Sequence, residues 1–263
     1  MIDPPAGRVT ILACGQDCGA WVNWRGSKGK RTAWKAACTV LLLTYIGWFV
    51  TLVSDSLVQQ TIGVVFASKL LIEAWGQDTP TWVVPGTVQL FVIVYVVGIP
   101  SIVGLYGYCR EVDVDIPYRE LLGLALYLFG STYSLSYELH RFWWKAKPEN
   151  KGKLHTTGLA RFCIHPNYFG DLFTYFGWGL AAGTQCAMSI TPAALFYLTL
   201  CVIPNSDAYL AKKYPDEFPQ YLESTARLIP GLRSQMASYL VAWAGLAISM
   251  LMEISCGKAC GMA

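Results

Sequence analysis

Seven apolar segments, each close to the length of a membrane-spanning helix, constrain this chain more than any other feature. They cover residues 34–54, 56–75, 84–107, 119–138, 169–187, 188–204 and 236–254. A helix needs about 20 mostly apolar residues to cross the hydrocarbon core of a bilayer. Hydrophobic residues make up 54% of the chain and charged residues only 14%, which is too apolar for a soluble domain with a polar shell. The sequence therefore predicts an all-α, multi-pass transmembrane helical bundle.

Two of these segments make the number of spans ambiguous. The segment 56–75 carries two glutamines together with Lys69 and Glu73, and the segment 188–204 is short and follows directly on another. If 56–75 spans the membrane, the basic N-terminus and the two most basic loops share one side, as the cytoplasmic bias of Lys and Arg requires. The charge pattern therefore favours about seven spans, with six as the alternative.

The apolar segments divide the chain into four parts. Residues 1–33 are polar and basic, 34–118 hold the first three segments, 119–235 hold the next three, and 236–263 add one helix and a short tail. No part between the segments is long enough to bury a core of its own, so we expect a single membrane domain surrounded by lipid. A net charge of +3, without a dense basic stripe, gives no indication of a nucleic-acid partner.

The nine cysteines do not show the spacing of a metal site. Cys256 and Cys260 are four apart, but no histidine lies near them in the sequence, so no metal is predicted. A disulfide between these two cysteines is expected only if the C-terminal tail faces an oxidising lumen.

The run of residues 158–171 carries several polar side chains between apolar segments. They are Arg161, His165, Asn167, Tyr168 and Asp171. Pro166 keeps His165 out of a helix, so the fifth apolar segment is expected to begin near Asn167 or Tyr168, with its N-terminus aimed at the cluster. Free N–H groups and the positive end of the helix dipole favour an anion such as phosphate there. In the structural alternative, Asn167 caps the helix and His165 makes a local hydrogen bond.

A second group of charges follows the fourth apolar segment. Glu138, Arg141 and Lys145 follow spacings of three and four, so a continuing helix would place them on one face. The cations suit phosphates, and the carboxylate suits the hydroxyls of a ribose. The alternative is an interfacial anchor, in which Trp143 and Trp144 lie at the level of the lipid headgroups and the cations reach lipid phosphates.

The run 158–171 resembles the motif of the steroid 5-alpha-reductase and sterol-reductase superfamily of membrane proteins. These proteins carry Gly-Leu, followed by a His-Pro-Asn-Tyr-Phe-Gly-Glu type sequence. Residues 209–231 resemble their closing Tyr-rich stretch, which ends in Ile-Pro. The resemblance covers residues 120 to 232 and is closest to the steroid-reductase-related branch. The isoprenylcysteine carboxyl methyltransferases are similar in the same His-Pro, Tyr and Gly pattern, as more distant relatives.

The resemblance implies that residues 119–235 form a helical cage that binds NADPH. It implies that Glu138 faces the ribose and that Arg141 and Lys145 lie near the phosphates. Asp171 replaces the more usual Glu, and Ile164 stands where many relatives carry Arg. The cofactor-binding residues that it implies are Glu138, Arg141, Lys145, Arg161, His165, Asn167, Tyr168, Gly170, Asp171, Tyr209 and Arg227.

The N-terminal half is the expected substrate side, and it shows no motif match. Reduction of an activated carbon–carbon double bond requires an acid near the carbonyl that becomes an enolate, often a Tyr oriented by a carboxylate. Glu73 and Tyr95 are the catalytic candidates, and Asp55 and Tyr45 are further polar groups in this half. The alternatives are a helix-end pair between Glu73 and Lys69, and simple packing of the tyrosines.

Three functions remain open from the sequence. The first is an NADPH-dependent oxidoreductase that acts on CH–CH groups of a lipophilic, steroid-like or other enone substrate, similar to a 3-oxo-5-alpha-steroid 4-dehydrogenase. The second is an S-adenosylmethionine-dependent methyltransferase, although those enzymes carry paired glutamates where Asn205, Ser206 and Asp207 stand here. The third is a non-catalytic membrane protein on the same fold. The expected location is the endoplasmic reticulum membrane, and a plastid or bacterial inner membrane satisfies the same physics.

Overall fold

The structure is a computed structural model that describes residues 28–52, 56–76, 118–183, 191–192 and 194–234, with scattered positions between 236 and 251. Every regular element among these residues is a helix, and one isolated parallel β-bridge joins Cys163 to Ala226. The main helices are α1 (Lys28–Leu52), α2 (Leu57–Leu71), α5 (Arg119–Ala146), α6 (Pro166–Ala182), α8 (Ile203–Lys213) and α9 (Phe218–Ser224). Short π and 3-10 turns are η1 (Ile72–Gly76), η4 (Pro148–Asn150), η5 (Gly158–Arg161) and η6 (Leu198–Val202). The described part of the chain is therefore helical, as the sequence predicts.

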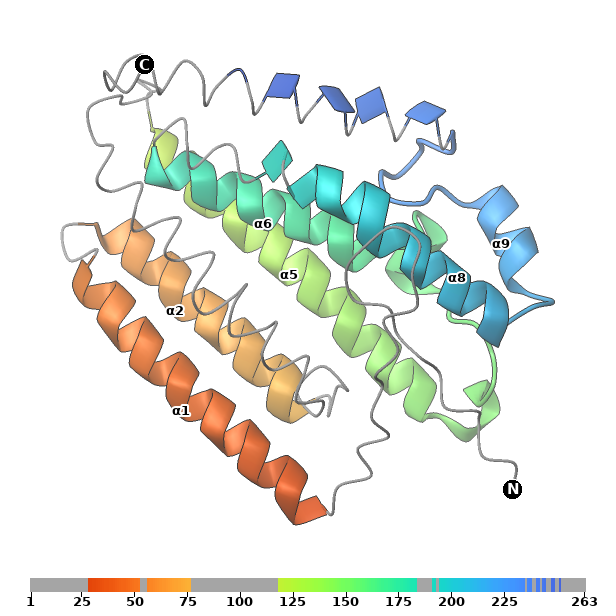
Figure 1. Cartoon of the computed structure of the whole chain (residues 1–263), viewed down its shortest axis with the longest axis horizontal. Helices are drawn as coiled ribbons and strands as arrows, with labels where there is room; N and C mark the ends of the chain where they lie inside the picture. The colour runs from red at the N-terminus through yellow and green to blue at the C-terminus, as the bar shows by residue number, and fades with distance from the viewer. Residues whose placement is uncertain are drawn as a thin grey trace.

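Four helices form the body of the fold. Figure 1 shows α1, α2, α5 and α6 side by side, with α2 between α1 and the α5–α6 pair. The helices α8 and α9 lie toward the end of the bundle at which α5 finishes. The helix α8 contacts α9 and follows directly on η6, so residues 198–224 lead to this end of the bundle. The polar segment that precedes α6 and the polar residues of α8 and α9, which follow α6, therefore lie at the same end of the bundle.

The predicted apolar segments and the observed helices agree in most of the described chain. By length and composition one described helix, Ala194–Lys213, can cross a membrane, while Lys35–Thr51 and Leu57–Leu71 are shorter apolar helices. This helix overlaps the predicted segment 188–204, of which residues 188–190 and 193 lie outside the described residues. The segment 84–107, Asp55, Tyr95, Cys256 and Cys260 lie outside the described residues, as do most positions of the segment 236–254. The count of about seven spans stays a prediction.

Glycines allow α5 and α6 to pack at backbone distance. Gly123 and Gly130 on α5 face α6, and Gly170 and Gly177 on α6 face α5. A Cβ added to Gly130 would lie 2.5 Å from the carbonyl oxygen of Gly170. A Cβ on Gly177 would lie 2.6 Å from the carbonyl oxygen of Gly123. In each helix the two glycines are seven residues apart, which keeps them on one face and lets the backbones approach closely.

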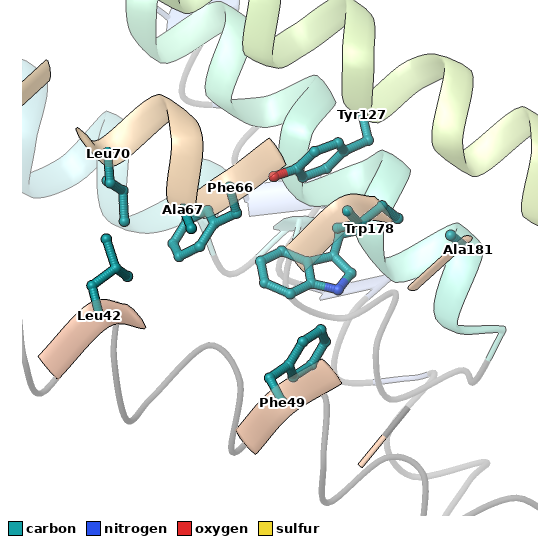
Figure 2. Close-up of a cluster of buried hydrophobic side chains, with 9 residues drawn as sticks. Leu42, Phe49, Phe66, Ala67, Leu70, Tyr127, Trp178 and Ala181 are labelled. Carbon is teal, nitrogen blue, oxygen red and sulfur yellow. The ribbon is translucent and has the colours of Figure 1, made fainter. Parts of the chain in front are cut away.

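A cluster of aromatic side chains joins all four helices. Trp178 of α6 lies at its centre, with ring centroids 6.1 Å from Phe49, 5.4 Å from Phe66 and 6.0 Å from Tyr127 (Figure 2). The rings of Phe49 and Tyr127 meet Trp178 edge to face, an arrangement worth roughly 0.5–1.5 kcal/mol per pair beyond the area that it buries. The indole Nε1 of Trp178 donates to Oε1 of Gln59 at 3.2 Å. This glutamine therefore serves the packing of the bundle.

The segment that connects α5 to α6 is held by the residues that follow α9. The backbone N–H of Ile164 donates to the carbonyl of Ala226 at 2.8 Å, and that of His165 donates to the carbonyl of Arg227 at 3.0 Å. The hydroxyl of Tyr221 donates to a carbonyl of η5 at 2.5 Å. These bonds fix the start of α6 against the closing stretch of the chain, so His165 and Arg227 become neighbours.

Candidate functional site

The N-terminus of α6 is the first part of the candidate site. Pro166 occupies the first helical position, where its missing N–H costs no hydrogen bond, and His165 stands in the N-cap position. The helix begins earlier than predicted, and the alternative in which Asn167 caps it is wrong, because Asn167 already lies within the first turn. The side chain of His165 makes no capping hydrogen bond. The positive end of α6 is therefore left without a side-chain cap.

His165 instead bonds to a carboxylate from α8. Its Nε2 lies 2.9 Å from Oδ1 of Asp207, and Nε of Arg227 lies 3.4 Å from Oδ2 of the same carboxylate. The imidazole also stacks on the ring of Tyr168, with 5.3 Å between centroids and 19° between planes. The Tyr168 hydroxyl lies 3.3 Å from Oγ of Ser206. Asp207 thus ties three segments together: the start of α6, the helix α8 and the closing stretch.

Asp207 is a site residue that the sequence did not single out as cofactor-binding. In the sequence it is notable only as part of the group Asn205, Ser206 and Asp207, which stands where the methyltransferases carry paired glutamates. Its side chain is 11% exposed, and a buried carboxylate requires a cationic or hydrogen-bonding partner. An acidic residue three positions after the apolar segment 188–204 is the available signal in the sequence. That signal does not identify the partners His165 and Arg227, which are 42 and 20 positions away from Asp207.

A second ion pair connects the two halves of the chain. Nζ of Lys69 on α2 donates to Oδ1 of Asp171 on α6 at 2.9 Å and to Oγ of Ser134 on α5 at 3.2 Å. The Lys69 and Asp171 side chains are only 13% and 23% exposed. Glu73 follows Lys69 by one helical turn, and the charges that act on it are those of Lys69, Asp171 and Glu138. The catalytic candidate Glu73 thus lies within electrostatic range of Asp171 in the run 158–171.

The charged residues near the end of α5 lie on one helix face. The helix continues to Ala146, which confirms the expectation that Glu138, Arg141 and Lys145 share a face. Nη2 of Arg141 lies 2.6 Å from Oε2 of Glu138, and Nε lies 3.2 Å from the same oxygen. Lys145 donates from Nζ to the hydroxyl of Tyr214 at 3.2 Å.

These contacts lie along one face of α5, and we call the charged and polar groups that make them the polar strip. It consists of Lys69, Ser134, Asp171, Glu138, Arg141 and Lys145. At a rise of 1.5 Å per residue, the eleven positions from Ser134 to Lys145 extend over about 16 Å. Tyr168 is within electrostatic range of Glu138, Asp171 and Arg141, which connects the strip with the Asp207 contacts. Both carboxylates belong to the inner part of the strip, and its outer end carries cations only.

The other residues implied by the resemblance are placed differently. Gly170 packs against α5, where a Cβ would lie 2.8 Å from the amide nitrogen of Ser134. Tyr209 is 55% exposed, and its hydroxyl accepts from Nζ of Lys213 at 2.9 Å. Arg161 is exposed at the end of η5, and Asn167 is half-buried in the first turn of α6. Gly170 therefore has a packing role, and Tyr209 lies on the exposed side of α8.

Two further titratable groups lie in the segment before α6. Nε2 of His155 is 3.2 Å from Nδ1 of His140, and burial lowers the pKa of His155 to about 4. Burial raises the pKa of the Cys163 thiol to about 12. At neutral pH the imidazole of His155 is uncharged and the thiol is protonated. A protonated thiol is a weak nucleophile, so Cys163 is a structural residue.

Fold and site together define a helical protein with a charged strip that begins between helices and ends at the exposed Lys145. A family model described as a protein of unknown function (DUF1295) matches residues 70–225, more than half of the chain. The chain belongs to this family. The match includes Glu73, Asp171 and Asp207, while Lys69 and Arg227 lie just outside its limits. No curated protein and no solved structure matches the chain.

Proposed function

We propose that this protein is a multi-pass membrane reductase that binds NADPH along the polar strip and reduces a carbon–carbon double bond of a lipophilic enone. The observation that carries the proposal is the order of charges along the polar strip. The carboxylates of Asp171 and Glu138 are followed by the cations Arg141 and Lys145, over about 16 Å. A dinucleotide has the matching order, because its riboses carry hydroxyl donors and its phosphates carry negative charge.

The local chemistry of the strip fits this cofactor. Carboxylates accept from ribose hydroxyls, and guanidinium and ammonium groups bind phosphate oxygens. The uncapped N-terminus of α6 adds a partial positive charge beside the strip. The pattern from His165 to Asp171 supports the same assignment, because it resembles the steroid 5-alpha-reductase motif.

The exposed surface of the helices supports a membrane location. On α1 the exposed residues include Val40, Leu43 and Trp48, each at least 50% exposed. On α5 Leu121 and Phe129 are 61% and 49% exposed. Contiguous apolar side chains of this kind are costly in water and favourable against lipid tails. A lipophilic substrate then reaches the site from within the bilayer, and we assign the protein to the endoplasmic reticulum membrane.

The residues of the chain have separate tasks in the proposed reaction. When bound, NADPH supplies a hydride. Glu73 holds a proton for the substrate oxygen, and Lys69 places a positive charge where negative charge develops on that oxygen. Asp171 orients Lys69 through their ion pair. Tyr95 remains a second candidate for the acid, outside the described residues.

The charge of the strip distinguishes this proposal from the methyltransferase alternative. S-adenosylmethionine carries a sulfonium cation and no phosphate. The carboxylates of the strip would suit that cation, but Arg141 and Lys145 would face no anionic group of comparable charge. A dinucleotide uses both parts of the strip, so the proposal favours NADPH.

Equilibrium binding of NADPH and S-adenosylmethionine to the detergent-purified protein tests the proposal. We expect NADPH to bind the wild type, and Arg141→Ala and Asn167→Ala to weaken it tenfold or more, since each removes a polar contact at the strip or the α6 N-terminus. Lys153→Ala is the control, because this exposed lysine lies in the segment between α5 and α6. Selective binding of S-adenosylmethionine would favour the methyltransferase, and binding of neither would favour a non-catalytic protein.

A further inference from the structure

The segment that connects α5 to α6 carries an excess of positive charge. Between residues 147 and 161 it has three lysines and Arg161, while Glu149 is its single carboxylate. Lys147, Lys151 and Lys153 are exposed, and no carboxylate in the described part of the chain forms an ion pair with them. The protein therefore presents these three charges at its surface without compensating them.

Two exposed aromatic side chains precede this segment at the end of α5. Trp143 is 60% exposed and Phe142 is 38% exposed. Leu121, near the start of the same helix, is 61% exposed, and the helix rises about 33 Å between Leu121 and Trp143. The hydrocarbon core of a bilayer is about 30 Å thick. When α5 crosses a bilayer with Leu121 at one boundary of this core, Trp143 therefore lies at the headgroups of the other boundary, and the lysines follow directly.

Contacts on the inner side of the segment fix the backbone that carries the lysines. Leu154 belongs to the same buried cluster as Tyr214, and its backbone N–H donates to Oε2 of Glu217 at 3.1 Å. The side-chain amide of Asn150 donates to the carbonyl of Trp144 at 2.8 Å. A fixed backbone loses little conformational entropy when the side chains that it carries bind a partner. The segment is thus preorganised as a binding surface.

We propose that Phe142, Trp143, Lys147, Lys151 and Lys153 form a binding surface for the headgroups of anionic phospholipids, which we call the basic rim. This inference rests on the membrane location in the proposed function and is independent of the cofactor. Ammonium groups bind the phosphate oxygens of a headgroup, and their uncompensated charge favours lipids with net negative charge over zwitterionic ones. Exposed aromatic rings favour the boundary between headgroups and acyl chains. An acidic protein would satisfy the lysines alone, whereas a lipid leaflet satisfies the lysines and the rings together.

Titration of the detergent-purified full chain with phosphatidylglycerol and with phosphatidylcholine, followed by native mass spectrometry, tests the basic rim. We expect the wild type to bind phosphatidylglycerol more tightly. Lys147→Gln, Lys151→Gln and Lys153→Gln should each weaken phosphatidylglycerol about fivefold and phosphatidylcholine less than twofold, the difference expected for one lysine beside an anionic headgroup. Trp143→Ala should weaken both lipids by similar factors, because the indole ring contacts the part that the two lipids share.

Glu149→Gln is the matched control, because it removes a charge of the opposite sign from the same exposed segment. It should leave the affinity for phosphatidylglycerol unchanged or raise it. The lysine variants alter only exposed side chains, so their Tm should match that of the wild type. Their affinity for NADPH should not change either, since none of the three lysines belongs to the polar strip.

Two results would overturn the inference. Equal affinity of the wild type for the two lipids would show that the charge of the rim does not select the headgroup. Unchanged lipid selectivity in the triple lysine variant would exclude the lysines from lipid binding, and a simultaneous loss of heparin binding would assign them to a soluble acidic macromolecule. A wild type that selects phosphatidylglycerol but does not bind NADPH would contradict the proposed cofactor and would still support the basic rim.

Discussion

Lys69 and Asp171 form an ion pair with 2.9 Å between Nζ and Oδ1, although 102 positions separate them in the chain. Lys69 belongs to α2, in the half that we assign to the substrate, and Asp171 belongs to the motif that we assign to the cofactor. Ser134 of α5 accepts a hydrogen bond from the same ammonium group. One cation therefore holds together three helices and links the two halves of the proposed active site.

Substitution of Lys69 by Met tests the energy of this contact. It leaves Asp171, which is 23% exposed, without its cation, and we expect the free energy of unfolding to fall by about 1–3 kcal/mol. The measurement is thermal unfolding in detergent of Lys69→Met, Asp171→Asn and the double variant. A coupling energy near zero in this double-mutant cycle would show that the pair does not stabilise the fold.

Substitution of Asp207 by Asn tests the anchoring of the α6 N-terminus. The amide lacks the charge that holds His165 and Arg227, so we expect the segment around His165 to open more often. Amide hydrogen exchange should accelerate at Ile164 and His165, whose N–H groups donate to residues 226 and 227.

The control for this experiment is Asp216→Asn, because Asp216 lies in the exposed turn between α8 and α9. We expect its exchange pattern to match the wild type. If Asp207→Asn also leaves exchange at residues 164 and 165 unchanged, the carboxylate of Asp207 does not fix this segment.

The glycine contact between α5 and α6 gives a third prediction. Gly130→Ala places a methyl group 2.5 Å from the carbonyl oxygen of Gly170, so the helices must separate, at a cost of about 1–3 kcal/mol or more. Gly47→Ala is the matched control, because no atom lies within 4 Å of an added Cβ there and alanine favours the helix. We expect Tm to fall for Gly130→Ala and to stay level or rise for Gly47→Ala. Equal Tm values for Gly130→Ala and the wild type would contradict the close packing.

Local features of the structure were largely predictable from the sequence. The apolar lengths of 34–54, 56–75 and 119–138 correspond to α1, α2 and α5, and the spacing of the charges after residue 138 correctly indicated one helix face. The apolar segment ends at residue 138 while α5 continues to Ala146, as the expectation of a continuing helix requires. The start of α6 at Pro166 follows from the preference of proline for the first helical position.

The tertiary partners were not predictable in the same way. Helical periodicity predicts contacts only between residues of one helix. From the sequence, Lys69 is therefore expected to pair with Glu73, four positions later. The pairing of Lys69 with Asp171, and of Asp207 with His165, depends on how distant helices pack. That packing depends on the glycines where α5 and α6 meet, and a single sequence does not show which helix each glycine contacts. The structure therefore adds contacts between polar segments that the sequence identified separately, and their role in binding stays a prediction.

The last prediction concerns acid sensitivity. Burial, together with the nearby His140, Arg141 and Lys145, lowers the pKa of His155 from 6.5 to about 4. Between these two values the unfolded chain binds a proton that the folded protein does not, so stability is complete above pH 6.5 and is lost as the pH falls toward 4. We expect this group to remove on the order of 1–2 kcal/mol by pH 5.

Thermal unfolding of the wild type and His155→Gln at pH 7.5 and pH 5 measures this effect. Because Gln does not titrate, the decrease in Tm between the two pH values should be several degrees smaller in the variant than in the wild type. His140→Gln is the companion variant: it removes the hydrogen-bond partner of His155 and one of the groups that lower its pKa, but leaves the burial. It should therefore retain most of the acid sensitivity. If His155 is buried and neutral in the folded protein, the wild type must lose more stability on acidification than His155→Gln. Equal losses in the two proteins would therefore show that other groups take up the proton.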